Sequence, residues 1–170
     1  MIHTYIGDGK GKTTAAVGLA VRYAGCGKKV EIIQFLKDGT SSECELLKNV
    51  FINVTSFMNP GSKFFWEMNE EEKKTLREET KKAFSHAKDL AEKDTDMIIL
   101  DEICGAVENG LIEKCELIEF LKTYGKEKEI VITGRTVCDD IIELSDYVSE
   151  IRKIKHPYDQ GINAKKGIEY

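Results

Sequence analysis

The chain has 170 residues, of which 41% are hydrophobic, and we expect residues 1–170 to form a single domain with a substantial core. Its formal net charge of -5 argues against nucleic acid or a membrane surface as the main partner. We find no apolar run long enough to span a membrane and no signal peptide before the first expected strand. The five cysteines are scattered and form no CxxC pair, which favours a reducing cytoplasm and argues against a structural zinc site.

The N-terminal segment has the pattern of a phosphate-binding loop. Residues 2–6 predict a strand, and residues 13–25 predict a buried helix. Glycines between them let backbone N–H groups approach an anion, and the helix N-terminus adds unpaired donors and a positive dipole end. We therefore expect Lys12 to contact phosphates and the Thr13 hydroxyl to contact Mg²⁺. The residues expected to bind the nucleotide are Gly7, Asp8, Gly9, Lys10, Gly11, Lys12, Thr13 and Thr14.

The loop departs from the usual spacing in one respect. The usual motif has four residues between its first glycine and the Gly-Lys pair, whereas Gly7 and Gly11 enclose only three. Asp8 is an unexpected neighbour for a triphosphate unless its side chain points away or caps the turn. A chance glycine-rich turn is the alternative, and a dinucleotide-binding GxGxxG motif is excluded because Lys12 stands at the third glycine position.

Downstream, apolar runs alternate with helical periodicity. The expected strands are residues 29–36, 50–57, 96–100, 129–133 and 147–151. The expected helices are residues 43–48, a long helix from Asn69, residues 111–124 and residues 139–144. We expect the tail, residues 152–170, to wrap the surface. Alternating strands and helices predict an α/β fold: a mostly parallel sheet with helices on both faces.

The helix from Asn69 has the clearest start signal. Asn69 can cap the helix, and Glu72 stands at the reciprocal position of a capping box. Apolar and small residues then recur on one face, which we expect to be buried: Leu76, Thr80, Ala83, Ala87 and Leu90.

Polar clusters follow several strands: residues 7–13, 34–37, 101–102 and 133–135. Because right-handed crossovers place the carboxyl ends of parallel strands at one edge, these clusters should converge on one crevice. Asp101 and Glu102 follow an apolar strand in the Walker B manner and are candidate Mg²⁺ ligands opposite Thr13, although either could instead merely end the strand. Arg135 is a candidate phosphate clamp, with a surface ion pair as the alternative.

Three aromatic residues, Phe64, Phe65 and Trp66, stand in a loop without an obvious face to bury them. They either fold back onto the core or line a pocket for a large apolar ligand. No Ser–His or Cys–His pair is evident, which suggests that the protein mainly positions reactants while a ligand supplies the nucleophile.

The chain resembles the P-loop type of corrinoid adenosyltransferase over nearly its whole length. The resemblance rests on these segments in this order: GDGKGKTTAA (7–16), QFLK (34–37), FFWE (64–67), ILDEI (99–103), TGR (133–135), KHP (155–157) and GIEY (167–170). It implies a RecA-like P-loop NTPase core, usually a homodimer, that transfers the 5′-deoxyadenosyl group of ATP to the cobalt(I) of a corrinoid (cobalamin) and releases triphosphate. A flavoprotein reductant is the implied partner.

The resemblance also implies site roles. Lys12 and Thr13 match the phosphate and metal contacts, Glu102 matches the Walker B acid with Asp101 beside it, and Arg135 lies in a motif near the nucleotide. Phe64 and Trp66 match aromatics that face the corrin and favour four-coordinate cobalt(II), which is easier to reduce. The catalytic set is then Lys12, Phe64, Trp66 and Arg135.

This chain departs from the family pattern in three places. It begins almost at the first expected strand, where relatives commonly carry an extension that helps to cover the site. Lys63 replaces a usual glycine in the aromatic loop, and residues 137–139 replace a more basic segment. Two other functions remain open from the residues alone: a P-loop nucleoside kinase or NTPase, and a non-enzymatic corrinoid carrier gated by ATP.

Overall fold

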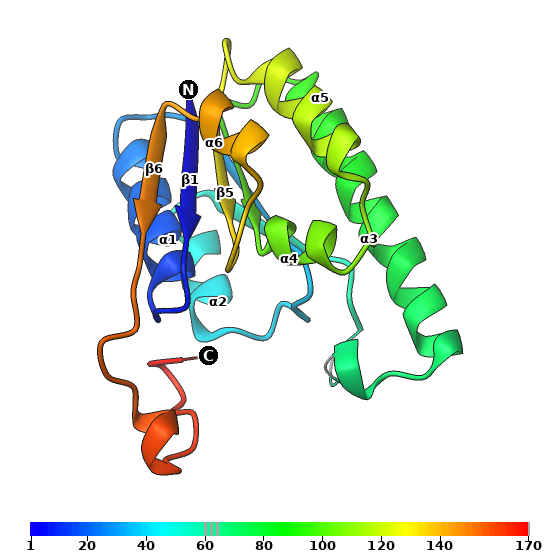
Figure 1. Ribbon diagram of the computed structural model, residues 1–170. Coiled ribbons are helices and arrows are strands. Elements are labelled where there is room, and N and C mark those ends of the chain that lie inside the picture. Colours follow the sequence, from blue (N-terminus) through cyan, green and yellow to red (C-terminus); the bar gives the residue numbers. More distant parts are fainter. Residues whose placement is uncertain (60, 62, 64, 170) are drawn as a thin grey trace.

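In the computed structural model, which describes residues 1–59, 61, 63 and 65–169, a six-stranded sheet forms the centre of the chain (Figure 1). All its strand pairs are parallel, and the strand order is β3-β2-β4-β5-β1-β6. The strands are β1 (Ile2–Ile6), β2 (Val30–Gln34), β3 (Ile52–Ser56), β4 (Met97–Asp101), β5 (Glu129–Thr133) and β6 (Tyr147–Glu150). The predicted α/β class is confirmed, and the sheet is entirely parallel.

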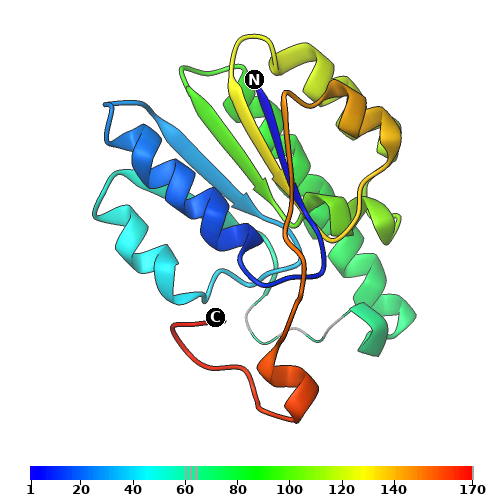
Figure 2. The same cartoon turned by 60° about the vertical axis from the view of Figure 1, so that its left-hand side comes forward.

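Helices cover both faces of this sheet (Figure 2). On one face, α1 (Lys12–Ala24) and α2 (Ser42–Lys48) pack over a cluster that includes Ala16, Ala20 and Leu47. The other face is covered by α3 (Glu70–Ala91), α4 (Ile103–Glu108), α5 (Lys114–Tyr124) and α6 (Asp139–Leu144). Because both faces are buried, the central strands consist of continuous apolar runs; every residue of β4 is buried.

The start of α3 follows the predicted capping box. The Asn69 side chain accepts a hydrogen bond from the Glu72 N–H at 2.9 Å, and Glu72 Oε2 accepts one from the Asn69 N–H at 2.8 Å. All five residues predicted for the inner face are buried: Leu76, Thr80, Ala83, Ala87 and Leu90. Local capping and helical periodicity therefore suffice to place this helix.

The helical region between β4 and β5 differs from expectation. The region predicted as one helix over 111–124 is helical only from Lys114, and the short helix α4 (Ile103–Glu108) before it was not predicted. The tail contains the 3₁₀ turn Pro157–Gln160, extends past the carboxyl ends of the strands and doubles back toward α2 (Figures 1 and 2). Within the described part of the chain, no helix is both long and apolar enough to cross a membrane.

Candidate active site

The glycines of the 7–14 loop meet the chain that leaves β6. The Gly9 N–H donates to Ile151 O at 2.8 Å, and a Cβ on Gly9 would lie only 2.7 Å from that oxygen. Gly7 has a positive φ of 115° and would clash with the same peptide. Gly11, the residue before α1, also has a positive φ, 122°, but a Cβ there would meet open space. Gly7 and Gly9 thus allow a close backbone approach, and Gly11 allows the turn into the helix.

Asp8 turns away from the helix N-terminus. Its Oδ1 accepts a hydrogen bond from the Lys153 N–H at 2.9 Å, and this bond lowers the pKa of the Asp8 carboxyl. The carboxylate therefore fastens the loop to the tail, and Asp8 is not among the described residues that line the crevice. Lys10 and Thr14 are exposed and line the crevice beside the loop.

Lys12, the first residue of α1, bends back over the loop. Its Nζ donates to Gly7 O at 2.8 Å and to Gly9 O at 2.9 Å. Partial burial lowers the pKa of this ammonium group. The contacts hold a cation in the concave side of the glycine loop, where phosphate oxygens can replace the carbonyls as its partners.

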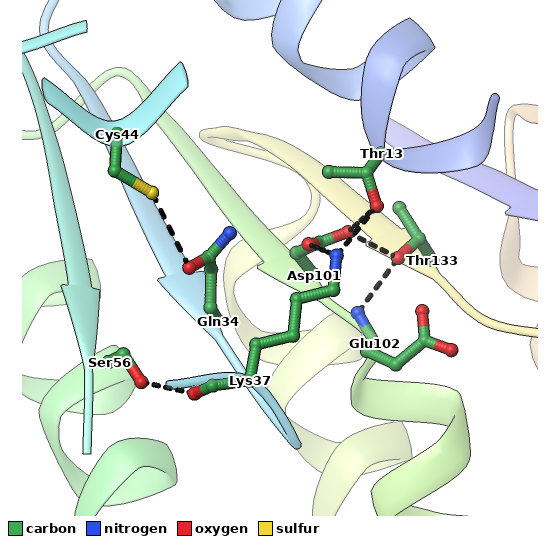
Figure 3. Close-up of polar contacts among 8 residues, drawn as sticks. All are labelled: Thr13, Gln34, Lys37, Cys44, Ser56, Asp101, Glu102 and Thr133. Carbon is green, nitrogen blue, oxygen red and sulfur yellow. Dashed lines mark hydrogen bonds and ion pairs between the residues drawn. The ribbon is translucent and has the colours of Figure 1, made fainter. Parts of the chain in front are cut away.

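Asp101 is the centre of a buried hydrogen-bond network at the end of β4 (Figure 3). Its Oδ1 accepts from Thr13 Oγ1 at 3.0 Å and from Thr133 Oγ1 at 2.8 Å. Thr133 Oγ1 in turn accepts from the Glu102 N–H at 2.8 Å. The predicted convergence is therefore present: residues from the ends of β4 and β5 meet the first turn of α1.

Lys37 completes this network, a role that the sequence does not predict. Its Nζ lies 2.6 Å from Asp101 Oδ2 and 2.9 Å from Thr13 Oγ1 (Figure 3). The sequence did place residues 34–37 at the crevice, but only their position after a strand signalled this. Gln34, nearby on β2, is buried and accepts a hydrogen bond from the Cys44 thiol.

Glu102 has a left-handed backbone, with φ of 67°, which is uncommon for a residue other than glycine. Burial raises the pKa of its carboxyl, and the positive charge of Lys37 opposes this rise. The side chain lines the same crevice as Lys10 and Arg135. A strained backbone that directs an acid into a cleft is a common feature of functional sites.

Arg135 contacts the phosphate loop through its backbone: the Gly7 N–H donates to Arg135 O at 2.9 Å. Its side chain is exposed and lines the crevice. Arg135 forms no ion pair with another described residue, so the structure does not support the alternative that Arg135 serves as a surface ion pair.

Both described aromatic residues of this loop line the crevice, but they differ in burial. Phe65 is partly buried and packs against the core, with Lys73 Nζ 5.6 Å from its ring centroid, whereas Trp66 is 74% exposed. Phe64, predicted to face the corrin, lies outside the described residues.

The crevice runs from the phosphate loop past Glu102 to Trp66 and the tail, and its volume is about 1210 Å³. Ile168 and Glu169 of the tail form part of its wall. Drug-sized ligands occupy pockets of about 300–1,000 Å³. The crevice is thus larger than the pocket that a single drug-sized ligand usually occupies.

The donor atoms at the end of β4 fit Mg²⁺. Mg²⁺ prefers hydroxyl and carboxylate oxygens, and usually takes one or two carboxylates together with substrate phosphates. Thr13 Oγ1 and Asp101 supply such oxygens side by side, with Glu102 next to them. In the part of the chain that the structure describes, no three or more His, Cys, Asp or Glu side chains are grouped so that they could hold a metal ion.

Comparison with known proteins agrees with this geometry. The family model "ATP:corrinoid adenosyltransferase BtuR/CobO/CobP" matches residues 1–170. The corrinoid adenosyltransferase of Escherichia coli K12 is 38% identical over 100% of this chain and 85% of that protein. Corrinoid adenosyltransferase CobA of Salmonella typhimurium is 37% identical over the same shares. The corrinoid adenosyltransferase of a Sinorhizobium species is 36% identical over 96% of this chain and 77% of that protein.

Among solved structures, domain III of the Thermotoga maritima replication initiation protein DnaA is similar with a TM-score of 0.39 and 19% identity, over 88% of this chain and 53% of that chain. This likeness is too distant to bear on function. The match of the family model to the whole chain, together with relatives above 30% identity, shows that the chain belongs to the ATP:corrinoid adenosyltransferase family.

Proposed function

We propose that this protein transfers the 5′-deoxyadenosyl group of ATP to the cobalt(I) of a corrinoid such as cobalamin and releases triphosphate. The observation that carries the proposal is the crevice that joins the phosphate loop to Trp66. It offers a triphosphate site and an apolar wall in one space, which is what a reaction between ATP and a large planar ring requires.

On the nucleotide side, the loop over residues 7–14 binds the triphosphate, which is the leaving group. Lys12 Nζ exchanges the carbonyls of Gly7 and Gly9 for phosphate oxygens, and Lys10 and Arg135 line the approach. Cations aimed at the charge that develops on a leaving group act most strongly in the transition state. Thr13 and Asp101, with Glu102 beside them, would hold Mg²⁺, and the bound ion supplies further positive charge to the triphosphate.

On the corrinoid side, Trp66 presents an aromatic surface to the corrinoid that excludes water and the lower axial ligand, and we propose the same role for Phe64. Cobalt(I) of the substrate is itself a strong nucleophile: it forms a bond to the C5′ carbon of ATP as the bond from C5′ to the triphosphate oxygen breaks. The protein therefore needs no Ser–His or Cys–His pair, because its residues align the two substrates and neutralise the leaving group.

The proposal extends to the domain organisation, location, oligomeric state and reductant of the protein. We propose that residues 1–170 act as one domain, that the protein works in the cytoplasm as a homodimer, and that a flavoprotein supplies the reduced corrinoid. The absence of a span-length apolar helix among the described residues is compatible with this location.

The test is anaerobic incubation of the protein with ATP, Mg²⁺ and chemically reduced cob(I)alamin. We expect the absorption spectrum of adenosylcobalamin to appear. Formation of ADP with a phosphorylated acceptor would instead identify a nucleoside kinase. Saturable corrinoid binding that ATP strengthens, without any alkyl–cobalt product, would identify a carrier.

A further inference from the structure

The ammonium group of Lys37 occupies the space between the proposed metal ligands. It lies 2.6 Å from Asp101 Oδ2 and 2.9 Å from Thr13 Oγ1, and Asp101 is only 1% exposed (Figure 3). A carboxylate buried to this extent needs a counter-charge, because an unpaired buried charge is strongly destabilising. Lys37 supplies it in the protein without nucleotide.

The backbone around Lys37 holds the side chain in this position. Leu36, immediately before it, has a left-handed φ of 56°, and this turn directs the chain from the end of β2 back into the crevice. Ser56 Oγ, at the end of β3, donates a hydrogen bond to Lys37 O. A left-handed leucine is costly and persists only where the surrounding structure enforces it, so the placement of Lys37 is built into the fold.

Two cations cannot share this space. A Mg²⁺ ion bound to Thr13 Oγ1 and Asp101 would have to replace the ammonium that now contacts both groups, and like charges at such a distance repel strongly. The four-carbon stem of lysine is flexible, and the Lys37 side chain lines the crevice into which the phosphates would extend.

We propose that Lys37 is an exchangeable counter-ion that excludes Mg²⁺ from Asp101 until a nucleotide arrives. The phosphates then accept the displaced ammonium, so that metal and nucleotide bind together and neither binds well alone. This inference rests on the metal site of the proposed function. It assigns Lys37 a second position, on the phosphate chain, in the nucleotide-bound protein.

The test compares Lys37→Met, which keeps the length of the side chain but removes the charge, with the parent protein. Mg²⁺ alone is titrated into each by calorimetry, and thermal unfolding is recorded with and without Mg²⁺. Removal of the competing cation should tighten Mg²⁺ binding without nucleotide by about tenfold or more, since 1.4 kcal/mol of relieved repulsion is a factor of ten. In the absence of Mg²⁺, Lys37→Met should have a lower melting temperature than the parent. Addition of Mg²⁺ should raise the melting temperature of the variant back toward that of the parent.

Lys48→Met is the matched control, because Lys48 is an exposed lysine of α2 that pairs with Glu45. It should bind Mg²⁺ like the parent. An Mg²⁺ affinity of Lys37→Met equal to that of the parent would overturn the proposal.

If Lys37→Met does not fold, Asp101→Asn and the double variant Asp101→Asn, Lys37→Met provide the answer. With the carboxylate removed, loss of Lys37 should no longer lower the melting temperature; an equal loss in this background would overturn the counter-ion role. Binding of ATP together with Mg²⁺ is measured for the parent protein as well. If the parent does not bind them, the proposed function is contradicted. If the parent binds them but Lys37→Met has the Mg²⁺ affinity of the parent, only the role of Lys37 is contradicted.

Discussion

Thr13 Oγ1 donates a hydrogen bond of 3.0 Å to Asp101 Oδ1 and so joins the start of α1 to the end of β4, across 88 positions of sequence. The sheet fixes the position of Asp101, since β4 pairs with β2 in a register that sets Asp101 beside Gln34. Both partners stand on rigid elements, which hold reactive groups more tightly than loops do. The two oxygens proposed to hold the metal are thus already side by side, although Lys37 contacts both of them.

We expect Lys12→Ala to lower turnover by about 10²-fold or more, because its charge is needed most as the triphosphate leaves. The fold should persist, since the hydrogen bonds of the Lys12 side chain are to the carbonyls of Gly7 and Gly9 within its own loop. Steady-state rates and circular dichroism test both statements. Lys114→Ala, which removes a surface partner of Asp140, is the control and should keep the parent rate. Parent-like turnover in Lys12→Ala would refute the role of this loop.

We expect Thr133→Val to destabilise the protein by about 1–3 kcal/mol, the usual cost of leaving buried polar groups unpaired. Thr133 is fully buried, and its hydroxyl serves both Asp101 Oδ1 and the Glu102 N–H. Thr80→Val is the matched control: Thr80 is also buried, but its hydroxyl bonds only to Leu76 O within α3. Urea unfolding measures both. If the free energy of unfolding falls equally in the two variants, the hydrogen bonds around Asp101 contribute no more to stability than the single bond of Thr80.

We expect Glu102→Gln to stabilise the nucleotide-free protein at neutral pH. Burial raises the pKa of Glu102 above its usual value of 4.5. The contribution of the Glu102 side chain to the free energy of unfolding is therefore fully present below pH 4.5, where the carboxyl is protonated, and is lost as the pH rises through the pKa of the folded state. Glutamine does not titrate. Above neutral pH the melting temperature of the variant should therefore exceed that of the parent, by about 2 °C or more, and the difference should shrink toward pH 4.5.

The same variant should need more Mg²⁺ for half-maximal activity, because the amide lacks the charge that holds the metal or orients its water. Glu119→Gln, at an exposed position of α5, is the control for both measurements. A variant that melts below the parent at every pH, or that has the metal requirement of the parent, would argue against this account of Glu102.

We expect Trp66→Ala to impair the reaction mainly when cob(II)alamin and a mild reductant are supplied, by about tenfold or more, or 1.4 kcal/mol in barrier. Trp66 lines the crevice but is not part of the phosphate loop, so ATP binding should be retained. Activity should recover substantially with prereduced cob(I)alamin, since that substrate bypasses the step that needs four-coordinate cobalt(II).

Phe51→Ala is the control for Trp66, because Phe51 is 90% exposed and does not line the crevice. The same pair of assays applies to Phe64→Ala. Equal losses in the two assays would indicate a general role in folding or binding, and no loss in either would place Trp66 outside the site.

The sequence predicts those parts of the fold that depend on local signals. The capping box of Asn69 and Glu72 and the apolar runs of the strands are short-range patterns, and the structure contains them. The short helix α4 escaped prediction because it follows β4 directly, contains Gly105 and is formed by burial against the sheet more than by propensity.

The details of the site depend on contacts that no local pattern encodes. Asp8 bonds to the Lys153 N–H across 145 positions, and Lys37 reaches Asp101 across 64. Parallel topology predicted that residues 34–37 and 101–102 lie at one edge, but the left-handed turn at Leu36 decides where the ammonium points. How far each aromatic residue is buried likewise depends on packing: Phe65 and Trp66 both line the crevice, but only Phe65 of the two packs against the core.

In the proposed reaction, one crevice brings the C5′ carbon of ATP to cobalt, and the whole phosphate chain leaves. The most direct test of this reaction is the ratio of inorganic triphosphate released to alkyl–cobalt bonds formed in an anaerobic single turnover with prereduced cob(I)alamin. The account predicts about one triphosphate for each adenosylcobalamin, since both arise in the same displacement. Release of ADP or of single phosphate, without a matching alkyl–cobalt product, would contradict it.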